Sequence, residues 1–145
     1  MSLRRFNTGL TVLLGLFVVS FGVRFLVDPH GAAAGFGIPN WPQGDAAGYF
    51  VVKGVRDLVC AIVLFILLAL RQRRALGWVM LADAIIPFGD AIAVLTHGGT
   101  MAAALGIHAA TGAVVIVAAV LLLRERPLPN TAATNPNPSV QPAVR

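Results

Sequence analysis

The chain has 145 residues, of which 57% are hydrophobic and only 12% are charged, whereas an ordinary soluble domain has about 45–50% and about 25%. This balance argues against a free soluble protein, and the length excludes an appended soluble catalytic module. The formal net charge is +5, but the basic residues are dispersed in short groups, which excludes the Lys/Arg stripe of a nucleic-acid-binding protein. Cys60 is the single cysteine, so an intrachain disulfide and a cysteine-built metal site are excluded as well. We therefore expect an integral membrane protein.

Four apolar stretches are long enough to cross a bilayer, which takes about 20 helical residues. In chain order they cover about 8–28, 49–70, 75–95 and 101–123. Arg4 and Arg5 precede the first stretch, a basic turn at 71–74 joins the second to the third, and Arg124 and Arg126 follow the fourth. The other two connections contain neither Lys nor Arg. The positive-inside rule therefore predicts an all-α, four-helix transmembrane bundle with both termini and the basic turn in the cytoplasm.

The two ends of the chain set the bounds of this domain. The first stretch has the charged and apolar regions of a cleaved signal peptide, but its small-residue triplet at 32–34 lies well beyond the apolar run, so we interpret the stretch as a helix. Residues 127–145 are rich in Pro, Asn, Thr and Ala and have nothing to bury, so we expect a disordered cytoplasmic tail. The four-helix domain is then 1–126.

The long outer connection at 29–48 is broken by Gly and Pro, yet Phe36, Ile38 and Trp41 make its centre apolar. Two interpretations of this connection are open. It lies on the membrane surface as a lid, or Trp41 joins Tyr49 in the outer aromatic belt.

Besides Asp28 at the very end of the first stretch, six charged side chains fall within the predicted helices, namely Arg24, Lys53, Arg56, Asp57, Asp83 and Asp90. Each would cost about 2.5–3.5 kcal/mol facing lipid at the bilayer centre, so we expect them to face the bundle interior or one another. Counting about 1.5 Å per residue from the outer helix ends places five of them in the outer half of the bilayer together with His108, whereas Asp83 lies deeper than the others. Helical spacing collects the polar residues of each helix on one stripe. The pattern predicts one polar chamber that opens outward.

Pro87 lies in the third predicted helix between Asp83 and Asp90. Because proline lacks an N–H, the carbonyl of Asp83 loses its helical partner, and Gly89 loosens the same turn. We predict a kinked third helix here. Freed carbonyls at membrane depth commonly line a cavity, although a plain proline kink accommodated by neighbouring helices explains the same pattern.

Four short motifs also point to a family. They are KGVRDL at 53–58, PFGD at 87–90, HGG at 97–99 and His108. Together they resemble the small four-helix integral membrane proteins of the domain-of-unknown-function family numbered 4267. The resemblance covers about 8–123 and implies the fold, but it supplies no reaction.

The primary hypothesis is a protein of the cell membrane whose chamber binds, or acts by acid/base chemistry on, a lipophilic or anionic small molecule. The Arg- and Ala-rich composition favours a bacterial cytoplasmic membrane. The candidate acid/base residues are Asp57, Asp90 and His108, and the candidate ligand-binding residues are Arg24, Lys53, Arg56 and Asp83. We expect no metal, no cofactor and no nucleic acid; membrane lipid and a lipophilic ligand are the expected partners, and a homo-oligomer is open.

Two alternatives are open. In the first, a small oligomeric proton-coupled transporter relays protons through Asp83, Asp90 and His108. In the second, the protein is a structural or accessory subunit whose charges form internal salt bridges, with Arg24 or Arg56 paired to Asp90 and Lys53 paired to Asp57. Motifs of metalloproteases, serine hydrolases and nucleotidases (HExxH, GxSxG, GxxxxGK[ST]) do not occur.

Overall fold

The computed structural model describes residues 3–125, and this part of the chain is all-α without a strand. The elements are α1 (Leu3–Val27), α2 (Pro29–Phe36), η1 (Gly44–Ala47), α3 (Gly48–Ala69), α4 (Arg73–Asp83), α5 (Ile85–Thr96), α6 (Met101–Ala103), η2 (Ala104–Ala109) and α7 (Ala110–Leu123). The four predicted apolar stretches correspond to α1, α3, α4 with α5, and α6 with η2 and α7. The predicted tail at 127–145 lies outside the described residues.

Three helical stretches are long and apolar enough to cross a membrane, namely Leu3–Val27, Arg73–Thr96 and Met101–Leu123. They are compatible with a membrane protein. Helix α3 has 22 residues and a comparable length, but it carries three charged side chains in its first half. Large apolar side chains stand exposed on the outer faces of the long helices, for example Leu13, Ile62, Ile92 and Val117. Such faces need an apolar environment or a partner.

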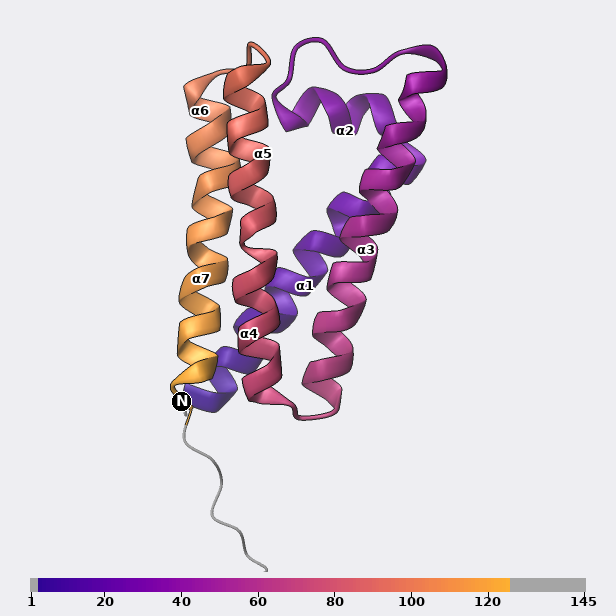
Figure 1. Ribbon diagram of the computed structural model, residues 1–145. Coiled ribbons are helices and arrows are strands. Elements are labelled where there is room, and N and C mark those ends of the chain that lie inside the picture. Colours follow the sequence, from indigo (N-terminus) through magenta and orange to yellow (C-terminus); the bar gives the residue numbers. More distant parts are fainter. Residues whose placement is uncertain (1–2, 126–145) are drawn as a thin grey trace, which may run out of the picture.

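The long helices form two antiparallel pairs (Figure 1). One pair is α1 with α3, and the other is α4 and α5 with η2 and α7. The α1–α3 pair is held close by glycines, since a Cβ atom on Gly22 would lie 2.9 Å from the carbonyl oxygen of Gly54, and one on Gly54 would lie 2.9 Å from that of Gly22. This is the close backbone approach that small residues permit between membrane helices.

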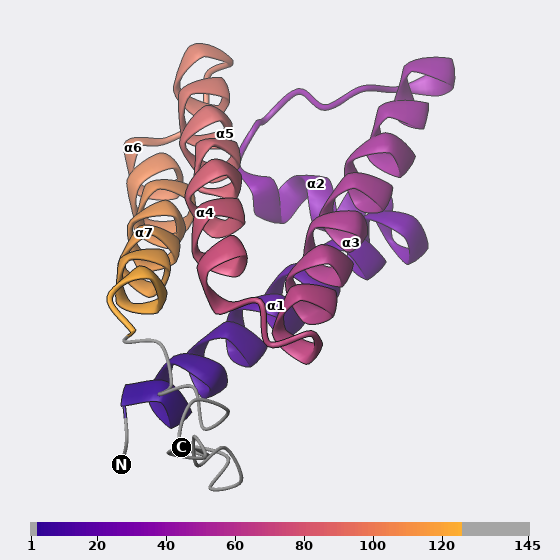
Figure 2. The same ribbon diagram turned by 60° about the horizontal axis from the view of Figure 1, so that its bottom comes forward.

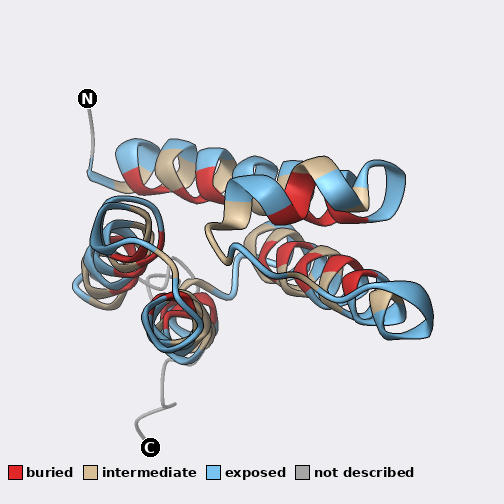
Figure 3. Ribbon diagram, turned by 90° about the horizontal axis from the view of Figure 1, so that it is seen from above, coloured by how far each residue is buried: buried red, intermediate tan, exposed pale blue. Residues whose placement is uncertain are grey.

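The two pairs meet at the end that holds the start of α1 and the end of α7, and they diverge toward the other end (Figure 1). Buried residues lie on the sides of the helices that face the interior (Figure 3). Where the pairs meet, they share one apolar core, made of Leu14, Leu64, Leu76, Met80, Ala118, Ala119 and Leu122. This core closes one end of the space between the pairs.

A partly buried polar network joins α1, α4 and Glu125, which lies just beyond α7, at the same end of the molecule. Arg73 donates to both carboxylate oxygens of Glu125, from Nε at 2.9 Å and from Nη2 at 2.7 Å. Asn7 Nδ2 donates to Glu125 Oε1 at 2.7 Å, and Arg73 Nη1 donates to Thr8 Oγ1 at 2.9 Å. Because Arg73 also binds the carbonyl of Arg4, α1 continues through the polar residues before its apolar run and begins at Leu3 instead of near residue 8.

Helix α2 crosses the diverging end between α3 and α5 (Figures 1 and 2). The hydropathy pattern does not predict this helix, but the residues at its two ends are typical of a helix start and a helix end. Asp28 caps its start by accepting a hydrogen bond from the Gly31 N–H at 3.0 Å, Pro29 occupies its first turn, and Gly37 ends it with a left-handed φ of 98°. Trp41 packs against the apolar cluster beneath α2, whereas Tyr49 is exposed. The connection at 29–48 is thus an ordered part of the fold.

The third predicted helix is interrupted at Ala84, between α4 and α5. The interruption lies one turn before Pro87, where the missing N–H leaves the Asp83 carbonyl without its helical partner. The α-helical pattern resumes at Ile85.

Candidate functional site

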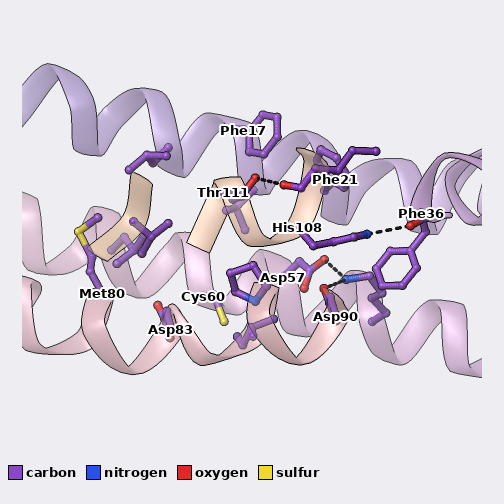
Figure 4. A pocket seen from close by; sticks show the side chains of 18 residues that line it. Phe17, Phe21, Phe36, Asp57, Cys60, Met80, Asp83, Asp90, His108 and Thr111 are labelled. Atoms are coloured by element: carbon purple, nitrogen blue, oxygen red, sulfur yellow. Dashed lines mark hydrogen bonds and ion pairs between the residues drawn. The ribbon is translucent and has the colours of Figure 1, made fainter. Parts of the chain in front are cut away.

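A cavity of about 120 Å³ lies between the two helix pairs, and α1 to α5, η2 and α7 all contribute to its wall. Most of the wall is apolar. Besides the thiol of Cys60, five ionisable side chains line it, namely Lys53, Asp57, Asp83, Asp90 and His108. Figure 4 shows how the three carboxylates and His108 are arranged around the space. All five are among the seven predicted site residues; their catalytic and ligand-binding roles stay predictions.

Lys53 is the centre of the ionic cluster. Its ammonium lies 3.1 Å from Asp57 Oδ2 and 3.4 Å from Asp90 Oδ2. The same nitrogen lies 5.2 Å from the ring centroid of Phe25 and 5.0 Å from that of Phe36, within range of cation–π attraction. One lysine therefore joins a carboxylate of α3 to a carboxylate of α5 across the gap between the pairs.

Asp57 is the most deeply buried carboxylate of the cluster, with 7% of its surface exposed. Its second oxygen accepts hydrogen bonds from Arg56 Nε at 3.2 Å and Nη2 at 3.1 Å. The predicted Lys53–Asp57 pair is present. Both oxygens of Asp57 are therefore bound to cations, whereas Asp90 makes a single ion pair, to Lys53, within the described residues.

The predicted pairs of Arg24 or Arg56 with Asp90 are wrong. The side chain of Arg56 is 43% exposed and lies beside the cavity instead of lining it. Arg24 is exposed, and its nearest polar contact is the Gly31 carbonyl oxygen at 3.4 Å. Because Gly22 faces α3, a residue two positions later points about 200° away around the helix. Arg24 is thereby excluded from the cavity.

Asp83 lies in the cavity wall toward the closed end. It precedes Asp90 by seven residues, which corresponds to about 10 Å along a helix. Within residues 3–125, no hydrogen bond or ion pair joins its carboxylate to another group. Cys60 lies between Asp83 and the carboxylates of the ionic cluster (Figure 4).

His108 belongs to η2, a π-helical segment within the last long helical stretch, and it is only 5% exposed. Its Nε2 lies 2.8 Å from the carbonyl oxygen of Phe36, and the two rings have centroids 4.5 Å apart. Since a carbonyl only accepts, Nε2 carries the hydrogen, and in the neutral ring Nδ1 is the acceptor. Short π-helical segments frequently occur at functional sites. Sequence reasoning missed Phe36 as a partner of this histidine.

A family model, Domain of unknown function (DUF4267), matches residues 15–122. The chain belongs to this family. The matched range contains every ionisable residue that lines the cavity. It also contains the motifs at 53–58, 87–90 and 97–99 and His108, on which the resemblance to the family rests. No curated protein and no solved structure matches the chain.

The charges of this DUF4267 protein almost balance around the cavity. Lys53 and Arg56 are neutralised by Asp57 and Asp90. Asp83 is left as the one carboxylate of the wall without a cation among the described residues. The arrangement offers hydrogen-bond donors and acceptors to the cavity. Residues 3–125 contain no group of His, Cys, Asp or Glu that could hold a metal ion.

A second cavity of the DUF4267 domain lies under α2 and has a volume of about 190 Å³. Aromatic rings form most of its wall, and the Lys53 side chain lines both cavities. The Nε1 donor of Trp41, also in this wall, is buried without a hydrogen-bond partner in the described part of the chain. Lys53 and Phe36 therefore lie between the first cavity and this aromatic space.

Proposed function

We propose that the chain is an integral membrane protein with four membrane-spanning helices and both termini in the cytoplasm. Helix α3, with 22 residues, is about 33 Å long, which is enough to cross a bilayer core. Two of its three charges, those of Lys53 and Asp57, line the cavity and so do not face lipid. Most basic residues of the described part of the chain lie at the end where the two pairs meet, which favours a cytoplasmic position for that end.

We further propose that the cavity between the helix pairs binds a lipophilic small molecule through a polar group. The observation that carries this proposal is a cluster of ion-paired side chains in the wall of an otherwise apolar cavity that is large enough for a small organic group. A purely structural ion pair is best enclosed by packed side chains. Here the side chains of Lys53 and Asp90 remain 19% and 20% exposed.

The contacts distinguish the roles of the candidate acid/base residues. Asp57 is bound to cations through both oxygens and positions Lys53. Asp90 has one oxygen in the Lys53 pair and the other available, and His108 has its Nδ1 available. Asp90 and His108 are therefore the groups that exchange a proton with a bound molecule in an acid/base reaction.

Transport receives less support from the same geometry. The polar wall ends at Asp83, and the shared apolar core fills the space beyond it. A relay through Asp83, Asp90 and His108 would lack polar groups over that distance.

The proposal is tested by native mass spectrometry of the protein released gently from membranes. Cys60→Phe places a ring in the cavity wall, and Val59→Phe places the same ring at the neighbouring, exposed position. We expect a bound small molecule on the wild type and on Val59→Phe and its loss from Cys60→Phe. If all three proteins carry only bulk lipid, the cavity is not a binding site.

The structural-subunit alternative is favoured by one observation, namely that the charges of Lys53, Arg56, Asp57 and Asp90 pair with one another. The triple variant Lys53→Met, Asp57→Leu, Asp90→Leu distinguishes the two functions. If the charges serve only as structural salt bridges, the variant folds and retains whatever the wild type carries, because replacing a whole buried ionic group by apolar residues often leaves the stability unchanged. A binding site loses its ligand.

A further inference from the structure

Asp83 is the residue that the proposed binding function leaves unexplained. Its carboxylate is half-buried in the wall of the apolar cavity and has no hydrogen-bond or ion-pair partner within residues 3–125. The ionised form of a carboxyl group in such a place is costly unless a cation or a hydrogen-bond donor meets it. Within residues 3–125, the two cations of the ionic cluster do not meet it, because Lys53 and Arg56 are both engaged with Asp57, and Lys53 also with Asp90.

The charged residues of the wall therefore indicate which charge a ligand beside Asp83 should carry. Two cations and two carboxylates cancel at the outer end of the cavity, and one carboxylate remains at its inner end. An anionic ligand would meet this carboxylate without a spare cation to bind. A ligand with a single positive charge would balance the wall.

The space beside Asp83 is suited to an apolar body. Leu14, Leu64 and Met80 line this end, and the phenyl rings of Phe17 and Phe21 lie along the α1 side of the same cavity (Figure 4). A volume of about 120 Å³ approaches that of the engineered apolar cavity of about 150 Å³ that holds a benzene molecule. Aromatic faces also attract an organic cation.

We propose that this cavity takes a lipophilic amine whose ammonium group pairs with Asp83 while its hydrocarbon part occupies the apolar wall. This inference rests on the proposed binding function and specifies its ligand class. The ionic cluster at Lys53 then serves as the outer wall of the site, and Asp83 is the residue that selects ligands with a positive charge.

The test compares three probes that share a phenyl ring and differ in charge, namely benzylamine, benzyl alcohol and benzoate. Their fluorinated forms are titrated by ¹⁹F NMR into the protein in lipid nanodiscs, with empty nanodiscs as the blank. For the wild type we expect benzylamine to bind at least about tenfold more tightly than benzyl alcohol, and benzoate to bind most weakly. Asp83→Asn keeps the shape of the side chain and should reduce the affinity for benzylamine to that for benzyl alcohol.

Two controls make the outcome decisive. Asp45→Asn removes an exposed carboxylate of η1, a segment that does not line the cavity, and should leave all three affinities unchanged. Cys60→Phe should weaken all three probes, because it occupies the shared space. Thermal unfolding of each variant verifies that it is folded.

The outcomes separate this inference from the proposed function. If benzyl alcohol binds the wild type as tightly as benzylamine, or Asp83→Asn leaves benzylamine unaffected, the amine inference is wrong although the cavity binds ligands. If Cys60→Phe has no effect on any probe, no probe occupies the cavity, and both the inference and the proposed function fail.

Discussion

The Nε2 atom of His108 lies 2.8 Å from the carbonyl oxygen of Phe36, a residue 72 positions earlier in the chain. Phe36 is the last residue of α2, so its carbonyl has no partner within the helix. The hydrogen bond supplies that partner and fastens the end of α2 to η2. Because the Phe36 ring also lies 5.0 Å from the Lys53 ammonium, the position of α2 is coupled to the ionic cluster.

His108→Ala should release the end of α2. The variant leaves a buried carbonyl without its donor, which costs about 1–3 kcal/mol. We expect faster amide hydrogen exchange in α2 than in the wild type, measured by mass spectrometry. His97→Ala is the matched control, because His97 is exposed and its hydrogen bonds are to Thr96 and Ala93 of its own helix. Equal exchange in the two variants would show that His108 does not hold α2.

Gly37→Ala should destabilise the docked position of α2. Gly37 has a φ of 98°, and a Cβ atom there would lie 2.8 Å from that of Ala103. A left-handed conformation alone costs an L-residue about 1–2 kcal/mol. Gly35→Ala, two residues earlier and with nothing within 4 Å, should instead stabilise α2 by up to about 1 kcal/mol. Thermal unfolding should move in opposite directions for the two variants, and a shift of equal sign would contradict this account of α2.

Much of this arrangement could be predicted from the sequence because hydropathy and helical spacing are local signals. The apolar stretches located the long helices, and the i, i+4 spacing placed Lys53 and Asp57 on one face. The same spacing placed Asp83 and Asp90 on one face of the third stretch, and both line the cavity. The partner of Asp90 was not predictable. It depends on how α1 and α3 are rotated against each other, which the contact between Gly22 and Gly54 sets.

The remaining contacts depend on tertiary structure alone. The docking of α2 requires that Phe36 meet His108 from a distant part of the chain. The network of Asn7, Arg73 and Glu125 joins residues at or beyond the ends of the apolar stretches, where hydropathy carries no information. Such pairs have no periodic pattern, so a single sequence does not reveal them.

Lys53→Met should destabilise the fold far more than Arg56→Met. Removal of Lys53 leaves Asp90 without its cation and the largely buried Asp57 with Arg56 alone. Breaking a buried ionic group by removing one partner costs about 3–5 kcal/mol. The Arg56 side chain is 43% exposed, and loss of an exposed pair costs about 0–1 kcal/mol. Denaturant unfolding in mild detergent measures the free energy of unfolding of both variants. Similar losses of stability would mean that Lys53 contributes no more to the ionic cluster than Arg56 does.

Glu125 should make the stability of the domain depend on pH. Burial tends to raise the pKa of Glu125, but hydrogen bonds from Arg73 and Asn7 and the charges of Arg73 and Arg4 outweigh it, so the pKa lies below its ordinary value. A carboxyl with a lowered pKa in the folded state stabilises that state above its unfolded pKa of about 4.3 and loses this contribution as the pH falls through the folded pKa. Near neutral pH, Glu125→Gln should therefore cost about 1.5–3 kcal/mol, the range for a hydrogen bond to a charged group.

This cost should shrink as the pH is lowered from about 6 to about 3, because the wild type loses the contribution that the variant already lacks. Unfolding of the two proteins across that range gives the difference directly. Asp45→Asn, which removes an exposed carboxylate at the opposite end of the molecule, should show no such convergence. A difference that stays constant with pH would mean that the Arg73–Glu125 contact stabilises the fold through packing and neutral hydrogen bonds instead of through the charge of the carboxylate.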